Sequence, residues 1–283
     1  MNEAIKIMLD RYRISTVFEH EQALREILQE IALVGLWRGK FFEHAAFYGG
    51  TALRIFYKLD RFSEDLDFTL LQPSPDWTWS PFGDCIKNEL TSYGFNVTFK
   101  EKEKSQQSAI KSAFLKTSTV QEMLKIGVSA DSMRGMHKEA LIRIRVEIDT
   151  NPTVPYSFEQ KFLEQPAPVS IRCINEVNLF AAKMHAALFR AWKGRVKGRD
   201  WYDMVWFIRR KIPLNLKLFS LHRGNGNILD AKEFKEMAHE RIDNLDVKSA
   251  IQDCVNFVRD QEVIRSTWSK DFFHYWINEI TFE

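Results

Sequence analysis

The chain has 283 residues, enough for one large or two modest domains, each able to bury a hydrophobic core. Hydrophobic residues make up 45% and charged residues 28% of the sequence, which excludes collagen-like, low-complexity and largely disordered proteins. The 40 basic residues nearly balance the 38 acidic ones, and a formal net charge of +2 by itself predicts no polyanionic partner. Any contact with nucleic acid must therefore come from a local basic patch.

The cysteines and the N-terminus indicate a reducing compartment. Cys85, Cys173 and Cys254 lie far apart and without metal-ligand spacing, so we expect neither a disulfide framework nor a structural zinc site. The first residues, MNEAIKIMLDRYRI, lack the basic head and apolar run of a signal peptide, and no stretch reaches the ~18 uninterrupted apolar residues of a membrane span. We expect a soluble cytoplasmic protein with no membrane partner.

The first seventy residues predict helices followed by two short strands. Apolar residues near helical spacing within residues 1–40 indicate one or two amphipathic helices. Residues 45–48 predict a strand, which leads through the turn Gly49-Gly50 into a helix at 51–59. Apolar and polar side chains alternate between residues 65 and 70, the period of a second strand.

The next segment mixes loop, helix and strand patterns. Residues 72–81, with three prolines and two tryptophans, predict a loop. A helix near 82–93, a strand near 95–100 and a polar connection through Ser108 follow. Residues 140–149 form the clearest strand pattern, with four β-branched side chains on one face and charged side chains on the other.

Prolines at 152, 155, 166 and 168 mark a linker-like region, the best candidate domain boundary. We predict an α/β domain with N-terminal helices at residues 1–165 and a helical domain at 166–283. Its amphipathic stretches lie near 174–192, 199–211, 231–242, 245–260 and 269–280. The expected fold class is α+β, a mixed β-sheet followed by an all-helical domain.

Two carboxylates form the first candidate site. Asp65 and Asp67 stand two residues apart on a strand, so their side chains project from the same face. Two like charges so close favour a cation between them, and oxygen-only ligands favour Mg²⁺ or Mn²⁺ over zinc. The alternative is a solvated strand face, because this spacing is common by chance.

Small residues before the carboxylate pair are typical of a phosphate-binding turn. Gly49, Gly50 and Thr51 stand at the start of a predicted helix, where free N–H groups and the positive end of the helix dipole suit a phosphate. A glycine pair there is by itself only a turn. Glycines at a helix start followed by a carboxylate pair on the next strand are a combination much rarer than either feature alone.

A third acidic residue would complete a two-metal site. Glu147 is the best candidate because it lies on the polar face of an otherwise apolar strand, and Asp149 shares that face. Two metal ions would activate an attacking hydroxyl and stabilise a leaving pyrophosphate oxygen. A surface strand with alternating charge is the competing interpretation.

Four blocks of sequence together resemble a known family. They are Gly49-Gly-Thr-Ala-Leu-Arg54, Arg61-Phe-Ser-Glu-Asp-Leu-Asp-Phe68, Ala181-Ala-Lys-Met-His-Ala-Ala-Leu-Phe-Arg190 and Lys197-Gly-Arg-Asp-Trp-Tyr-Asp203. This order resembles the AbiEii/AbiGii toxin family, the nucleotidyltransferase toxins of abortive-infection toxin–antitoxin pairs that include the MenT toxins. The family belongs to the nucleotidyltransferase superfamily related to DNA polymerase β.

The resemblance implies roles for residues by position. It places Gly49, Gly50 and Ser63 around the nucleotide phosphates, Asp65 and Asp67 on the metal, Lys183 on a phosphate, and Asp200 as a further catalytic carboxylate. The match at Glu147 is weaker. The related pattern often has a serine directly after its first glycine, so Thr51 here shifts which hydroxyl reaches a phosphate.

A basic segment follows the third block. Between Arg190 and Lys211 there are eight basic and two acidic residues, a local balance of +6. With Trp192 and Trp201 interleaved, this segment could track a nucleic-acid backbone and stack bases. It could equally hold a triphosphate, or the tryptophans could belong to the core.

Together these observations predict a Mg²⁺-dependent (or Mn²⁺-dependent) nucleotidyltransferase that moves a nucleoside monophosphate from an NTP to an acceptor hydroxyl. The resemblance implies a toxin opposed by a cognate antitoxin, and tRNA acceptor ends are substrates of some family members. Two alternatives stay open. One is a nucleotidyltransferase that modifies a protein or a small molecule, and the other is a non-catalytic nucleotide-binding module of the same fold.

Overall fold

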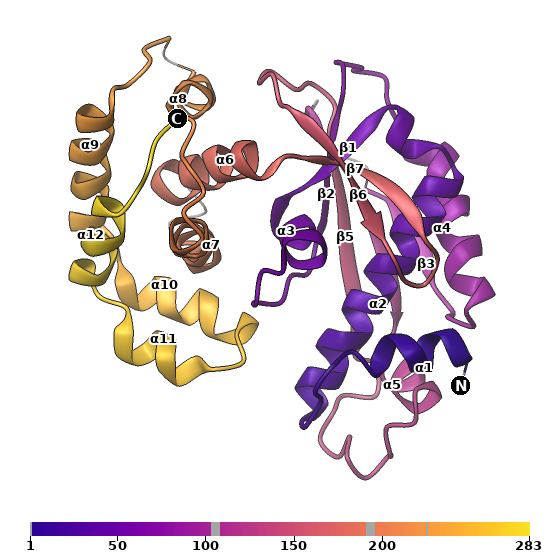
Figure 1. Cartoon of the computed structure of the whole chain (residues 1–283). Helices are drawn as coiled ribbons and strands as arrows, with labels where there is room; N and C mark the ends of the chain where they lie inside the picture. The colour runs from indigo at the N-terminus through magenta and orange to yellow at the C-terminus, as the bar shows by residue number, and fades with distance from the viewer. Residues whose placement is uncertain (1, 103–107, 191–195, 225) are drawn as a thin grey trace. The chain divides into compact units, whose positions relative to one another are not determined.

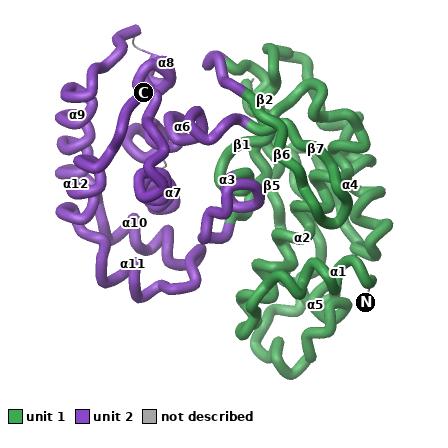
Figure 2. Tube along the Cα trace, viewed as in Figure 1, with its two compact units in different colours: residues 1–52, 63–152, 158–173 green, residues 53–62, 153–157, 174–283 purple. Residues whose placement is uncertain are grey.

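The computed structural model describes residues 2–102, 108–190, 196–224 and 226–283. The chain divides into two compact units (Figure 2). Unit 1 comprises residues 1–52, 63–152 and 158–173, and unit 2 comprises residues 53–62, 153–157 and 174–283. No helix in the described ranges is long and apolar enough to cross a membrane.

Unit 1 is built on a seven-stranded mixed sheet in the order β3-β4-β5-β2-β1-β7-β6 (Figure 1). The strands are β1 (Ala45–Tyr48), β2 (Leu66–Leu70), β3 (Thr98–Glu101), β4 (Ile110–Ser118), β5 (Leu141–Asp149), β6 (Phe158–Leu163) and β7 (Val169–Ile174). β2 is antiparallel to β1 and parallel to β5, while β4 is antiparallel to β5. The predicted mixed sheet is therefore confirmed.

The alternating pattern of β5 sets which of its faces is buried. Ile142, Ile144, Val146 and Ile148 are at most 1% exposed. The charged residues of β5 alternate with these four and lie on the opposite face of the strand. β5 pairs in register with β2, so the polar face of β5 continues onto the polar positions of β2.

Helices cover the sheet of unit 1. They are α1 (Glu3–Leu9), α2 (Val17–Arg38), α4 (Ser80–Ser92), α5 (Thr119–Lys125) and the short 3₁₀ helix η1 (Phe41–Glu43). Helix α2 begins at a capping box in which the Thr16 side chain accepts from the Glu19 N–H and the Glu19 side chain accepts from the Thr16 N–H. Its long apolar stripe is buried, which confirms the helices predicted for residues 1–40.

Helix α3 (Gly49–Tyr57) follows β1 directly, and the boundary between the two units falls within it. The remaining helices belong to unit 2. They are α6 (Glu176–Phe189), α7 (Gly198–Arg209), α8 (Leu216–Arg223), α9 (Ala231–Asp243), α10 (Val247–Cys254), α11 (Gln261–Thr267), α12 (Lys270–Asn278) and the 3₁₀ helix η2 (Val255–Phe257). The core of unit 2 is aromatic, and the rings of Phe180 and Phe207 stack 4.8 Å apart. The predicted helical second half is confirmed.

Several elements differ from the sequence prediction. The region predicted as a linker contains two strands, β6 and β7. Pro166 and Pro168 lie between these strands, where a proline removes no hydrogen bond of the sheet. Residues 166–173 accordingly belong to unit 1. Strand β4 and the short helices α5, α8 and α11 were not predicted, and helix α3 begins at Gly49 rather than at residue 51.

One glycine in unit 2 permits close packing of two helices. A Cβ atom added to Gly198, the first residue of α7, would lie 1.8 Å from the carbonyl oxygen of Ala250 in α10. A backbone atom cannot move aside as a flexible side chain can. Only glycine therefore fits at this contact.

We predict that Gly198→Ala lowers the free energy of unfolding by at least about 2 kcal/mol, because the methyl group forces the helices apart. The matched control is Gly224→Ala, also in unit 2, where φ is +70° but no atom lies within 4 Å of the added Cβ. That change should cost only the backbone strain, about 1 kcal/mol. Urea denaturation measures both, and equal losses would contradict the packing argument.

Candidate active site

Strand pairing brings the three predicted metal carboxylates to one part of the sheet in unit 1. Asp67 lies on β2 directly opposite Glu147 on β5, in a parallel register that also pairs Leu66 with Val146. Asp65 immediately precedes β2. Residues that are 80 positions apart in the sequence thus stand on neighbouring strands, which only the sheet topology could establish.

Arg145 is the cation that contacts this cluster. Its Nη2 lies 2.6 Å from Asp65 Oδ2, and its Nη1 lies 3.5 Å from Glu147 Oε2. The other Glu147 oxygen accepts a hydrogen bond of 2.8 Å from Ser112 Oγ. The hydrogen bond to Asp65, reinforced by the nearby carboxylates, raises the pKa of the Arg145 guanidinium above its usual value. Sequence reasoning did not identify Arg145.

Asp149, the alternative third carboxylate, has a different neighbourhood. It pairs in register with Thr69, and its Oδ1 accepts a hydrogen bond of 3.0 Å from the N–H of Asn151. This contact closes the turn that follows β5. The register therefore favours Glu147 over Asp149 as the partner of Asp67.

Gly49 allows the Asp67 carboxylate to approach the start of helix α3. Its φ is +82°, and an added Cβ would lie 2.5 Å from Asp67 Oδ2. Gly50 follows in the first turn of the helix, whose N–H groups lack intrahelical acceptors. The predicted glycine turn and the predicted carboxylate are thus in direct contact.

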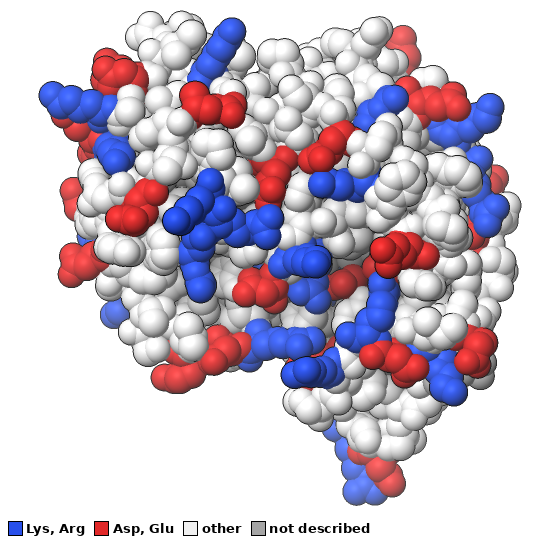
Figure 3. Space-filling view, viewed as in Figure 1, with Lys and Arg blue, Asp and Glu red and all other residues white. Residues whose placement is uncertain are grey.

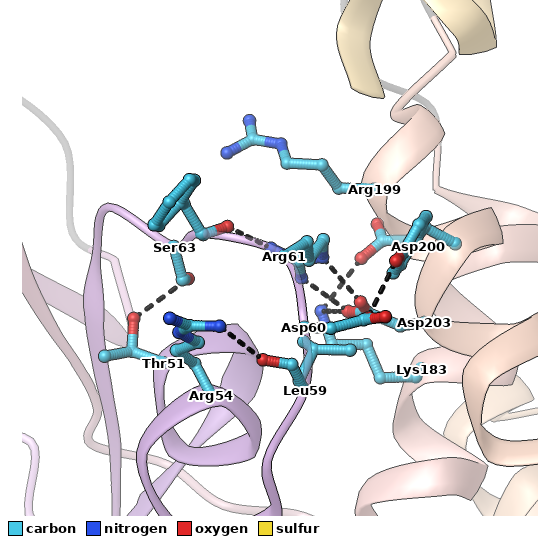
Figure 4. A network of polar contacts seen from close by, with 12 residues as sticks. Thr51, Arg54, Leu59, Asp60, Arg61, Ser63, Lys183, Arg199, Asp200 and Asp203 are labelled. Carbon is cyan, nitrogen blue, oxygen red and sulfur yellow. Dashed lines mark hydrogen bonds and ion pairs between the residues drawn. The ribbon is translucent and has the colours of Figure 1, made fainter. Parts of the chain in front are cut away.

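The two predicted hydroxyl residues hold the loop that precedes β2. Thr51 is fully buried, and its Oγ1 lies 2.9 Å from Ser63 Oγ (Figure 4). The same hydroxyl hydrogen-bonds the carbonyl of Asp65. Gln29 also donates to the carbonyl of Ser63, at 3.2 Å. These contacts give Thr51 a local structural part, while its predicted role in nucleotide binding stays a prediction.

Lys183 and Asp200, two residues to which the resemblance assigns separate roles, lie next to each other in unit 2. Lys183 Nζ, on α6, lies 3.0 Å from Asp200 Oδ1 and 2.8 Å from Asp203 Oδ2, both on α7 (Figure 4). Asp203 also binds the guanidinium of Arg61 in a bidentate pair, with distances of 2.6 and 2.7 Å. Arg190 Nη1 lies 3.1 Å from Asp200 Oδ2.

These charges stabilise one another despite their burial. Burial alone would raise the pKa of Asp203, but Arg61 and Lys183 outweigh it and hold that pKa below its usual value. Burial would likewise raise the pKa of Asp200, yet Lys183, Lys197 and Arg190 lower it. Burial would lower the pKa of Lys183, but Asp203 and Asp200 raise it. All three groups are therefore ionised at neutral pH.

Lys197 differs from these groups. Burial is the largest influence on it and lowers its pKa to about 8, although Asp200 acts in the opposite direction. The neighbouring cations Lys183, Arg190 and Arg199 add to the decrease. Lys197 therefore loses its proton more readily than an exposed lysine.

Sequence reasoning missed Arg61 and Asp203 as site residues, although both lie in the quoted blocks. Asp203 follows Asp200 by three positions on a helix, so both face Lys183, a spacing that could have identified it. The predicted basic segment is only partly visible, because Trp192, Lys193 and Arg195 lie outside the described residues. Trp201 is 3% exposed and packs against Phe273, so it belongs to the core.

The visible surface also carries no uniform basic field. In the space-filling view, acidic and basic side chains are interspersed (Figure 3). This agrees with the near-zero net charge of the chain.

The carboxylates of unit 1 suit a hard divalent cation by donor type, because Asp65, Asp67 and Glu147 offer only oxygen. Among the described residues, however, no three His, Cys, Asp or Glu side chains are arranged around a common metal position. Instead of a metal ion, the Arg145 guanidinium contacts two of the three carboxylates. The three carboxylates therefore fit such a cation by the chemistry of their oxygens, although their side chains are not gathered around one position.

Comparisons with known proteins identify what the chain is similar to. The family model described as "Nucleotidyl transferase AbiEii toxin, Type IV TA system" matches residues 31–275. No curated protein matches the sequence. In the comparison with solved structures, ten chains match.

Among the solved structures, JHP933 from Helicobacter pylori has a TM-score of 0.50 and 17% identity, covering 91% of this chain and 90% of that one. A putative nucleotidyltransferase from H. pylori also has a TM-score of 0.50 and 17% identity, covering 90% and 92% of the two chains. MenT4, nucleotidyltransferase toxin Rv2826c from Mycobacterium tuberculosis H37Rv, has a TM-score of 0.47 and 13% identity, covering 99% and 94%. The two H. pylori structures show that the chain shares their fold.

The charge network of unit 2 generates a stability prediction. Asp203→Asn leaves Arg61 buried without its carboxylate, so we expect the free energy of unfolding to decrease by about 3–5 kcal/mol. The control is Glu236→Gln, which removes an exposed ion pair with Lys232 at 3.8 Å and should change stability by less than about 0.5 kcal/mol.

The network also predicts how stability depends on pH. Because the pKa of Asp203 is lower in the folded protein, the unfolded chain binds protons more readily, and stability decreases as the pH falls below about 4. Asp203→Asn should reduce that decrease, as measured by urea denaturation between pH 3 and 7. An unchanged acid dependence would show that Asp203 does not carry it.

Proposed function

Because the chain belongs to the AbiEii family of nucleotidyltransferase toxins from toxin–antitoxin systems, we propose that it transfers a nucleoside monophosphate from an NTP to an acceptor hydroxyl and releases pyrophosphate. The observation that carries this proposal is the register of β2 and β5, which pairs Asp67 with Glu147 next to Asp65. The proposal includes a cognate antitoxin as partner and the cytoplasm as the place of action.

In the proposed reaction, the carboxylates of unit 1 hold Mg²⁺ or Mn²⁺. Asp65, Asp67 and Glu147 would bind the cation, which supplies charge neutralisation at the transferred phosphate and activation of the acceptor hydroxyl. The N-terminal turn of α3, with Gly49 and Gly50, offers backbone N–H groups suited to the phosphates. Thr51 and Ser63 are proposed to support the same contact.

Two residues of unit 2 are also proposed to take part in the reaction. Lys183 keeps its proton because two carboxylates hold it, so it can neutralise charge on the triphosphate. Asp200 fixes the position of that ammonium group and is proposed as a further catalytic carboxylate. Transfer of this kind depends mostly on positioning and on charge neutralisation, so loss of one such group slows the reaction by orders of magnitude.

The acceptor is proposed to be RNA, with a tRNA 3′ end as the leading candidate. The support comes from the basic residues between Arg190 and Lys211, of which Arg190 and Lys197 lie beside Asp200. Binding through such residues weakens steeply with salt. A protein or small-molecule acceptor, by contrast, predicts a flat salt dependence.

We predict that Asp67→Asn decreases nucleotide transfer at least about a hundredfold, because the carboxylate paired with Glu147 no longer binds the cation. The assay incubates the purified protein with each α-³²P-labelled NTP, Mg²⁺ and either total RNA or cell extract, and follows the label on a gel. Undiminished labelling by the variant would contradict the assignment. Nucleotide binding without transfer by the wild type would favour the non-catalytic module.

Two glycine substitutions, at Gly49 and Gly94, test the same carboxylate from its neighbour. Gly49→Ala places a methyl group against Asp67 Oδ2 and should impair transfer, whereas Gly94→Ala should not. Gly94 has a similarly positive φ of +90° but no atom within 4 Å of the added Cβ. Equal effects of the two changes would mean that backbone strain, and not the carboxylate, is responsible.

A further inference from the structure

A guanidinium contacts one oxygen of each of two carboxylates that are proposed to bind the metal ion. Arg145 contacts Asp65 Oδ2 at 2.6 Å and Glu147 Oε2 at 3.5 Å. Strand register produces this arrangement, because Arg145 lies two residues before Glu147 on the same face of β5, and β2 runs parallel beside it. The strand register therefore brings Arg145 close to Asp65 and Glu147.

A metal ion and this guanidinium compete for the same lone pairs. Ser112 already donates to Glu147 Oε1, so both carboxylate oxygens of Glu147 are engaged when Arg145 is in place. A divalent cation bound next to the guanidinium would also be repelled by its charge. Arg145 therefore opposes binding of a cation by Asp65 and Glu147 together.

We propose that Arg145 is a resident counter-ion of the carboxylate cluster, which competes with the divalent metal for Asp65 and Glu147 and is displaced when the metal binds. The inference rests on the proposed function, because it assumes that the metal binds at these carboxylates. In the metal-free protein Arg145 offsets the repulsion between the carboxylates. It also makes the affinity for the metal lower than the carboxylates alone would give.

The surroundings allow this exchange. The side chain of Arg145 is 42% exposed, and those of Asp65 and Glu147 are each 24% exposed. Ion pairs at such partly hydrated sites are weak enough to open without unfolding. A groove of about 570 Å³ beside Asp65, lined in part by Arg145, Phe114 and Arg143, gives the displaced guanidinium room.

Arg143 offers a matched control within the same groove. It lies two residues before Arg145 on the same face of β5 and carries the same charge. Its guanidinium carbon lies 5.7 Å from the ring centre of Phe114, to which it is directed by a cation–π contact. Removing its charge changes the general electrostatic potential without removing the competitor.

The test measures Mn²⁺ binding to the full-length protein by isothermal titration calorimetry, without nucleotide. Arg145→Gln should lower the Kd for Mn²⁺ at least about threefold relative to the wild type, and Arg143→Gln should lower it clearly less. Arg145→Lys, which keeps a charge but loses the two-pronged contact, should lie between the wild type and Arg145→Gln. Circular dichroism confirms that each variant is folded.

Three results would overturn the inference: an unchanged or higher Kd in Arg145→Gln, an equal decrease in Arg143→Gln, or no Mn²⁺ binding by any variant. The labelling assay judges the proposed function separately. If Arg145→Gln binds Mn²⁺ more tightly while the wild type labels no acceptor, the counter-ion stands and the proposed function fails. If the wild type labels an acceptor while the Kd is insensitive to Arg145, the proposed function stands and the counter-ion fails.

Discussion

The parallel pairing of β2 with β5 is the constraint on which the candidate site depends. It places Asp67 opposite Glu147 and Asp65 beside Arg145, so acidic residues from distant parts of the chain gather at one place. Side chains on one strand face repeat every two residues, and a register shift of one position would turn Glu147 into the core. The buried isoleucines of β5 prevent such a shift, because their burial holds the strand in register.

Like charges that lie close together repel one another, and each unit offsets this repulsion with different cations. In unit 1 a single arginine contacts two partly hydrated carboxylates, and we propose that a cation can displace it. In unit 2 the acidic side chains of Asp200 and Asp203 are fully buried and bound by Lys183 and Arg61. Removing one partner there leaves a buried charge unpaired, so the network favours rigid placement of Lys183 over exchange.

Much of this could be predicted from the sequence, because it depends on local patterns. The alternation in residues 140–149 and the glycine turn before a helix indicated β5 and the start of α3. The AbiEii family match over residues 31–275 confirms that resemblance. The predicted roles of the individual site residues stay predictions.

The parts that could not be predicted depend on long-range pairing. Nothing local shows that Arg145 will contact Asp65, since strand order decides this, and nothing local assigns Arg61 to Asp203, 142 positions later. The local pattern does not indicate strand β4, and the prolines around strands β6 and β7 are typical of a linker even though both strands pair in the sheet. These strands are defined by their neighbours in the sheet more than by their own sequences.

The most direct test of the account is anomalous diffraction from crystals of the wild-type protein grown with Mn²⁺. We expect an anomalous peak on the polar face of β2 and β5, bound by Asp65, Asp67 and Glu147, with the Arg145 guanidinium moved away from Asp65. A structure at saturating Mn²⁺ in which Arg145 still contacts Asp65 and no peak lies at these carboxylates would contradict it.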